Sequence, residues 1–194
     1  MKSLQITKLI ELLRSANQTH IEIPDLISLY ESTTRSDLVA ESIYKIHKTL
    51  ETFKPRTPVH VYNEANIARH LLDYVPKINY GRRFGHTFGL AKYILEESKR
   101  NRSHRITVVF PSSHLVCNFT DALKSICSPQ QLTAIVGNLN VVSNSFKLTQ
   151  HIEETDTLII ADFFNSACTT SWLESFGCYL KKDKKIIIVG DYLA

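Results

Sequence analysis

The sequence predicts an α/β domain with a wound, mainly parallel β-sheet, preceded by a small helical N-terminal region. From about Lys77 onward, short β-branched runs alternate with stretches of helical periodicity, as in wound α/β domains. The runs TVVF, LIIA and IIIV are apolar at every position, which is typical of parallel strands covered by helices on both faces. The stretch KPRTP at residues 54–58 stops a helix and favours an extended connection. We therefore divide the chain into regions 1–56 and 57–194.

Composition and charge are those of an ordinary folded protein. The chain has 194 residues, of which 43% are hydrophobic and 22% are charged, so it can bury a full core. The formal net charge of +4 permits contact with a polyanion without indicating one. The N-terminus, MKSLQITKLIELLRS, is amphipathic and unlike a signal peptide, and no apolar run reaches membrane-spanning length. We expect a cytoplasmic protein without membrane contact, whose four cysteines are free thiols.

The N-terminal region is predicted to be helical. Apolar residues recur at helical spacing between residues 6 and 13. A second, short helix is expected after Pro24, and a third is expected to begin at Ser36, a good N-cap, and to continue to about Phe53. A fourth helix is predicted for NEANIARHLLDYV, with Asn63 as its N-cap.

Strands and helices are expected to alternate in the remainder of the chain. The apolar, β-branched runs predict strands at residues 77–80, 105–110, 157–161 and 185–190. Helical periodicity predicts helices at residues 87–98, at 113–126 and around Trp172. The stretch from residue 132 to 148 is expected to be rich in strand.

The segment KINYGRRFGHTFGLAKYIL, residues 77–95, carries the most informative functional pattern. A short strand leads into a turn that contains Gly81 and Gly85, and a helix begins at or near Thr87. Glycines let backbone N–H groups turn toward a phosphate, and the helix N-terminus adds partial positive charge. A hydroxyl in the first helical turn can hold the magnesium ion of a nucleotide. A Gly-x-x-x-Gly turn before a helix also occurs in α/β folds that bind no phosphate.

This segment resembles the Walker A loop of P-loop NTPases, in particular the arginine-containing form in the RecA-like ATPase core of phage terminase large subunits and helicase-like motors. Three further segments follow in the order of that family: RITVVFPSSH after the second strand, TLIIADFF resembling Walker B, and KKIIIVGD resembling the later strand that ends in a coupling motif. The resemblance covers residues 77–194. It implies parallel strands in one sheet, with strand 185–190 between strands 77–80 and 157–161.

The resemblance also implies a site for ATP and Mg²⁺. Thr87 and Asp162 would hold the magnesium ion, and Asp162 and Asp191 would be the catalytic carboxylates. The residues implied in nucleotide binding are Gly81, Arg82, Arg83, Gly85, His86 and Thr87. A link to nucleic-acid metabolism, a further domain or protein partner, and a location in the host cytoplasm if the protein is viral are implied as well.

Two departures from the family pattern affect the chemistry. His86 stands where the family has its phosphate-binding lysine, and histidine is shorter and mostly uncharged at neutral pH. Phe163 stands where a glutamate polarises the attacking water, which phenylalanine cannot do. Arg82 or Arg83 could supply the missing phosphate charge, since guanidinium binds phosphate well. We therefore predict weak or no hydrolysis.

The connection KRNRSHR concentrates four basic residues between a helix and a strand: Lys99, Arg100, Arg102 and Arg105. Such a run is either a solvated loop or a contact to nucleic-acid phosphates. The histidines are scattered and form no pair at metal-ligand spacing. Two alternatives to a nucleotide-binding motor domain remain: a catalytically dead pseudo-ATPase that serves as a binding or regulatory module, and an unrelated α/β interaction protein.

Overall fold

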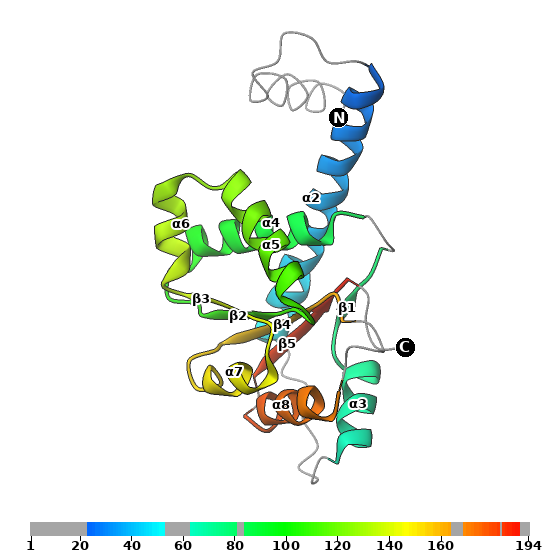
Figure 1. Cartoon of the computed structure of the whole chain (residues 1–194), viewed down its shortest axis with the longest axis vertical. Coiled ribbons are helices and arrows are strands. Elements are labelled where there is room, and N and C mark those ends of the chain that lie inside the picture. Colours follow the sequence, from blue (N-terminus) through cyan, green and yellow to red (C-terminus); the bar gives the residue numbers. More distant parts are fainter. Residues whose placement is uncertain (1–22, 53–62, 81–83, 164–168, 183, 191–194) are drawn as a thin grey trace.

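Five parallel strands form one sheet in the order β1–β5–β4–β2–β3 (Figure 1). The computed structural model describes residues 23–52, 63–80, 84–163, 169–182 and 184–190, with side chains from residue 33 onward. The strands are β1 (Lys77–Ile78), β2 (Ile106–Val109), β3 (Leu139–Val142), β4 (Thr157–Ala161) and β5 (Lys185–Val189). The prediction of a parallel α/β sheet, with β5 between β1 and β4, is confirmed.

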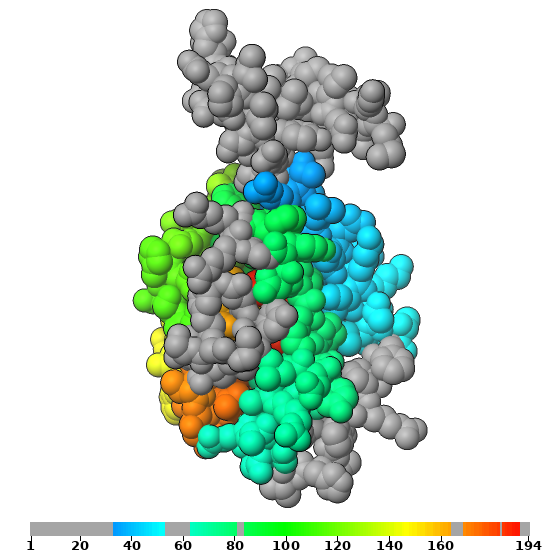
Figure 2. Space-filling model, turned by 90° about the vertical axis from the view of Figure 1, so that its right-hand side faces the viewer, coloured from blue at the N-terminus to red at the C-terminus, as the bar shows by residue number. Residues whose placement is uncertain are grey.

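Helices cover both faces of this sheet and produce three layers. One face carries α2 (Ile23–Thr52), α4 (His86–Arg100), α5 (Ser113–Ile126) and α6 (Pro129–Val136). The other face carries α3 (Glu64–Asp73), α7 (Ser145–Gln150) and α8 (Thr170–Lys181). In Figure 2, α2 (blue to cyan) lies against α4 (green), and α3 (teal) adjoins α8 (orange).

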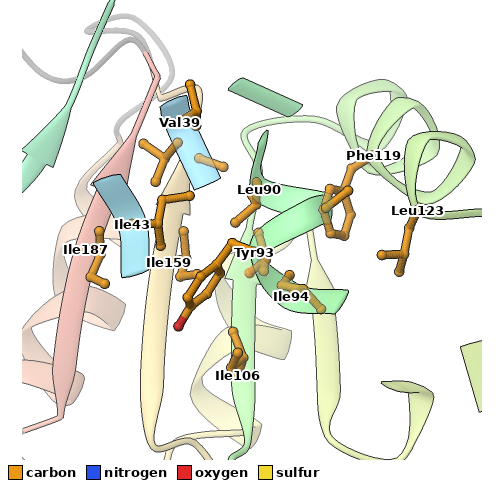
Figure 3. Packing of buried hydrophobic residues seen from close by; sticks show 14 of the residues in the cluster. Val39, Ile43, Leu90, Tyr93, Ile94, Ile106, Phe119, Leu123, Ile159 and Ile187 are labelled. Atoms are coloured by element: carbon orange, nitrogen blue, oxygen red, sulfur yellow. The ribbon is translucent and has the colours of Figure 1, made fainter. Parts of the chain in front are cut away.

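Side chains that alternate along each strand separate the interior into two cores. On β4, Ile159 faces the core beneath α2 and α4, whereas Ile160 faces the core beneath α3 and α8. Figure 3 shows Ile43 of α2 lying beside Ile159 and beside Ile187 of β5, in the core to which Val39 also belongs. Although α2 belongs to the N-terminal region in the sequence, it is therefore one of the helices that bury the sheet. The boundary predicted within KPRTP lies outside the described residues.

The helix α2 is continuous over 30 residues, so the prediction of two separate helices in this stretch is wrong. Ser36 does not cap a helix: its Oγ donates a hydrogen bond to the carbonyl oxygen of Thr33 one turn earlier, at 2.9 Å. Pro24 lies in the first turn, where its missing N–H removes no intrahelical hydrogen bond. Ser36 is thus compatible with a helix interior and Pro24 with a helix start, so the local sequence permits either one helix or two. Packing on the sheet favours the single helix.

The prediction that residues 132–148 are rich in strand is also wrong. Only β3 is extended there, between α6 and α7. Ser128 begins α6 with a capping box, in which its side chain accepts from the N–H of Gln131 and the Gln131 side chain accepts from the N–H of Ser128. Asn144 caps α7 by accepting from the N–H of Phe146, at 2.8 Å. The apolar composition of the segment suggested strands, but these two caps mark the starts of helices.

The other predicted elements agree more closely with the structure. The helix predicted at 113–126 is α5, and the helix predicted at 87–98 is α4, which begins one residue earlier and ends two residues later. Asn63 caps α3 as expected, since its side chain accepts from the N–H of Asn66 at 2.9 Å. The strand predicted at 77–80 is only two residues long. Among the described helices, none combines the length and apolarity that a membrane span requires.

Gly89 allows α4 to approach α2 closely. A Cβ atom at this position would lie 2.6 Å from Cγ1 of Val39 and 2.8 Å from the carbonyl oxygen of Ser36. Both distances are well inside van der Waals contact, and the second involves backbone that cannot move aside. The contact between α2 and α4 therefore depends on a residue without a side chain.

We predict that Gly89→Ala lowers the free energy of unfolding by about 1–3 kcal/mol, because the added methyl group overpacks the α2–α4 contact. Gly137→Ala is the matched control, since a Cβ at Gly137 would meet no atom within 4 Å. Its effect should stay within about 0.5 kcal/mol. Urea denaturation of both variants measures the difference. Equal stability of the two variants would contradict the close approach.

Candidate functional site

The predicted phosphate loop connects β1 to α4 at the carboxyl edge of the sheet. Gly85 is the N-cap of α4 and has φ +82°, a left-handed conformation that favours glycine. Glycine has no side chain with which to cap the helix, so the first N–H groups of α4 can serve an anion. The loop residues Gly81, Arg82 and Arg83 lie outside the described residues.

His86, at the position of the family's lysine, turns back into the loop. Its side chain is buried, and its Nε2 accepts a hydrogen bond from the N–H of Tyr80 at 3.3 Å. A ring nitrogen that accepts carries no proton, so the imidazole is neutral in this arrangement. One N–H of the loop is thus bonded to His86.

The helix α2 contributes to the surroundings of this loop. The hydroxyl of Tyr80 lies 2.7 Å from Oγ of Ser42, and the Tyr80 ring stacks on Phe84 with 4.7 Å between centroids. The guanidinium carbon of Arg35 lies 5.8 Å from the centroid of the Phe84 ring. Sequence analysis missed Ser42 and Arg35, because they precede the loop by about 40 residues and carry no motif.

Asp162 lies directly after β4, at the same edge of the sheet as the loop. Its φ is +54°, which is uncommon for a residue with a side chain, and its N–H donates to the carbonyl oxygen of Val189 at 2.9 Å. Such backbone conformations gather at functional sites. The carboxylate leans over Gly190: a Cβ there would lie 3.1 Å from Cγ of Asp162. Gly190 therefore leaves space for the Asp162 carboxylate.

The remaining predicted residues of the ATP site are only partly described. Thr87 is half-buried in the first turn of α4, where a magnesium-binding hydroxyl is expected. Asp191 lies outside the described residues. The fold thus brings Gly85, His86 and Thr87 to the same sheet edge as Asp162.

Phe163 belongs to the core on the α8 side of the sheet. It is 1% exposed, and its ring packs edge-to-face on Trp172 and Phe176, with centroid distances of 5.1 Å and 5.6 Å. Position 163 therefore points away from solvent. A glutamate here would be buried among aromatic rings and could not activate a water at the carboxyl edge.

The basic residues predicted to contact nucleic acid lie at the other end of α4. Lys99 forms an ion pair within the helix at 2.6 Å, and the guanidinium of Arg100 lies 4.0 Å from the ring centroid of Tyr44. In the last turn both also interact favourably with the helix dipole. Arg102 and Arg105 are exposed. The 15 residues of α4 separate this basic loop from the phosphate loop by about 22 Å.

A cluster that sequence analysis missed lies near the C-terminal end of α4. His47, Glu97 and His104 are all buried, and one potential ligand atom of each lies within 4.8 Å of the other two. Burial and the neighbouring His104 lower the pKa of His47. Burial also raises the pKa of Tyr93, whose hydroxyl lies 2.9 Å from Nδ1 of His47. The three residues come from α2, α4 and the loop before β2, so no local spacing could reveal them.

A cavity of about 500 Å³ adjoins this cluster at the amino edge of the sheet. His104 and Glu51 line it, together with residues at the starts of β4 and β5, among them Asp156 and Lys185. No described residue of the phosphate loop lines it. Cavity and phosphate loop thus lie at opposite edges of the sheet.

The sequence was compared with protein-family models and with curated proteins, and neither comparison gives a match. The functional assignment therefore depends on the residues themselves and on their placement at the two edges of the sheet.

We predict that Phe163→Glu destabilises the fold by about 3–5 kcal/mol, because it removes a buried ring and buries a charge without a partner. Phe163→Leu keeps an apolar side chain of similar volume and should cost about 1–2 kcal/mol. Thermal and urea unfolding distinguish the two. A Phe163→Glu variant as stable as Phe163→Leu would show that position 163 faces solvent.

Proposed function

We propose that the chain is a degenerate P-loop nucleotide-binding domain, linked to nucleic-acid metabolism, that binds ATP with Mg²⁺ and hydrolyses it weakly or not at all. The observation that carries this proposal is the meeting of two features at the carboxyl edge of one parallel sheet. A strand, a glycine turn and a helix N-terminus form one feature, and Asp162 after β4 forms the other. Open α/β sheets bind their ligands at this edge.

Each group has a role that its chemistry supports. The N–H groups at the start of α4 would bind phosphate oxygens, because the helix dipole favours an anion there. The Thr87 hydroxyl and the Asp162 carboxylate would hold magnesium, which takes oxygen ligands and keeps several waters. The arginines Arg82 and Arg83 remain predicted suppliers of positive charge, Asp191 remains a predicted catalytic carboxylate, and the basic loop remains a predicted nucleic-acid contact.

Two local arrangements favour binding over hydrolysis. Phosphoryl transfer needs charge between the terminal phosphates and a group that orients the attacking water. His86 is neutral while it accepts from Tyr80, and Phe163 is committed to the core. A glutamate at position 163 would disturb the fold before it could serve catalysis, because this position is buried among aromatic rings.

A protein-binding module is the second candidate, favoured by apolar side chains near the loop. Leu38, Tyr80 and Phe88 are exposed by 44%, 46% and 45%, and they lie on α2, in the loop and in the first turn of α4. Exposed apolar groups that gather on one surface mark interaction sites. A nucleotide could then regulate a partner that docks beside it.

We predict that millimolar ATP with Mg²⁺ raises the melting temperature of the chain, because a ligand of the folded state stabilises it by mass action. At a concentration 100 times Kd the gain is about 2.7 kcal/mol. Thr87→Ala and Asp162→Asn should each reduce the shift. Thr133→Ala, at an exposed position on α6, is the matched control and should leave the shift unchanged.

The unmodified chain should release no measurable phosphate from ATP by itself. Rapid hydrolysis would show that a base other than residue 163 serves the site, with Asp191 the first to substitute. Absence of any thermal shift in a well-folded sample would favour the protein-binding module instead.

A further inference from the structure

We propose that His47, Glu97 and His104 form a binding site for a divalent transition-metal ion of the Zn²⁺ type. The site would lie beside the cavity at the amino edge of the sheet, where water can complete the coordination. It is independent of the proposed nucleotide site, because the two lie at opposite edges of the sheet and share no residue.

The side chains suit such an ion in number, kind and spacing. Two imidazoles and a carboxylate are a frequent set of three protein ligands for zinc, with bonds of 2.0–2.2 Å. Ligand atoms around a tetrahedral ion are then about 3.4 Å apart. Nδ1 of His104 lies 2.7 Å from Oε1 of Glu97, and Nδ1 of His47 lies 4.0 Å from Oε2 of Glu97. Each distance is within about 1 Å of that spacing, but the two involve different oxygens of Glu97. The carboxylate and the His47 ring must therefore turn for the three ligand atoms to surround one ion.

His104 already has the outer hydrogen bond that orients a metal-bound histidine. Its Nε2 lies 3.0 Å from Oγ1 of Thr157, at the start of β4. In the present arrangement Nδ1–H donates to the Glu97 carboxylate at 2.7 Å, because a carboxylate can only accept. An ion would displace this proton from Nδ1, and Nε2–H would then donate to the Thr157 hydroxyl. Partners of this kind fix the tautomer and the ring orientation of metal ligands.

His47 is the ligand that must move. Its ring stacks on that of His104, with 4.6 Å between centroids and 29° between planes, so the two lone pairs do not converge in this arrangement. The ring is held at one nitrogen only: Nδ1 lies near the Tyr93 hydroxyl, whereas the buried Nε2 has no hydrogen-bond partner among the described residues. A rotation about the Cβ–Cγ bond would exchange one hydrogen bond for a bond to the metal.

The site would reach solvent on the side of His104, through the cavity. His104 lines the cavity, and so does Glu51, whose Oε1 is 3.8 Å from Nε2 of His47. Two charges lie nearby: the Glu51 carboxylate would offset part of the charge of the ion, and Lys185, 3.9 Å from the same Glu51 oxygen, would oppose it. The bound ion would join α2 and α4 to the loop before β2.

The test uses the full chain, first treated with EDTA. Zn²⁺ is added in slight excess and unbound ion is removed by gel filtration before elemental analysis. We expect close to one Zn²⁺ retained per chain and a higher melting temperature, both reversed by EDTA. Co²⁺ in place of Zn²⁺ should show the intense visible absorption of a site with four or five ligands. A chain that retains no Zn²⁺, or a Co²⁺ spectrum like that of the hydrated ion, overturns the proposal.

Variants locate the ion. Glu97→Gln and His104→Gln should weaken Zn²⁺ binding by about 100-fold or more, since the loss of even an outer-shell partner costs about 10- to 100-fold. Glu96→Gln changes the neighbouring carboxylate, which is exposed on the same helix, and should leave binding unchanged. Retention of Zn²⁺ by Glu97→Gln and His104→Gln at the unmodified level would place the ion on surface residues and overturn the proposal. Glu97→Gln is nearly isosteric, and the Co²⁺ spectrum of the unmodified chain decides the matter if that variant does not fold.

Discussion

The burial of a sheet that is apolar on both faces is the constraint on which this structure depends. All five positions of β4 and all four of β2 are buried, so neither face can be left to water. Helices must therefore cover each face completely. The α3 and α8 layer covers one face, and α4 to α6 cover only part of the other. The long helix α2 packs across β5 on that second face, which makes a helix from the N-terminal region part of the α/β core.

The parallel direction of the strands then separates the chemistry into two edges. Every strand ends at the carboxyl edge, where the chain places Gly85 at a helix start and Asp162 in a left-handed conformation. Every strand begins at the amino edge, where the loop before β2 supplies His104 beside the cavity. The helix α4 runs from one edge to the other. It has His86 at its first position and Glu97 near its last turn, so one rigid element contributes to both candidate sites.

The two departures from the motor-family pattern have a structural counterpart. At position 163 the side chain contributes an aromatic contact to the core beneath α8, which stabilises the fold and rules out a catalytic role there. At position 86 the imidazole bonds to the N–H of Tyr80, whereas the family that the sequence resembles has a lysine there. Both side chains thus have a structural role, and neither carries the group that the resemblance predicts at its position.

The sequence by itself determined the elements whose signals are local. Apolar runs on both faces identified the central strands of a parallel sheet, and Asn63 marked the start of α3 through a hydrogen bond within one turn. The position of Asp162 was also predictable, because it directly follows the apolar run that forms β4. Other features depend on residues far apart in the chain. Ser36 has the chemistry of a cap but lies inside α2, because packing on the sheet outweighs a local preference. His47 and His104 are 57 positions apart in the sequence and adjacent in space, since only the packing of α2 against α4 and the sheet brings them together.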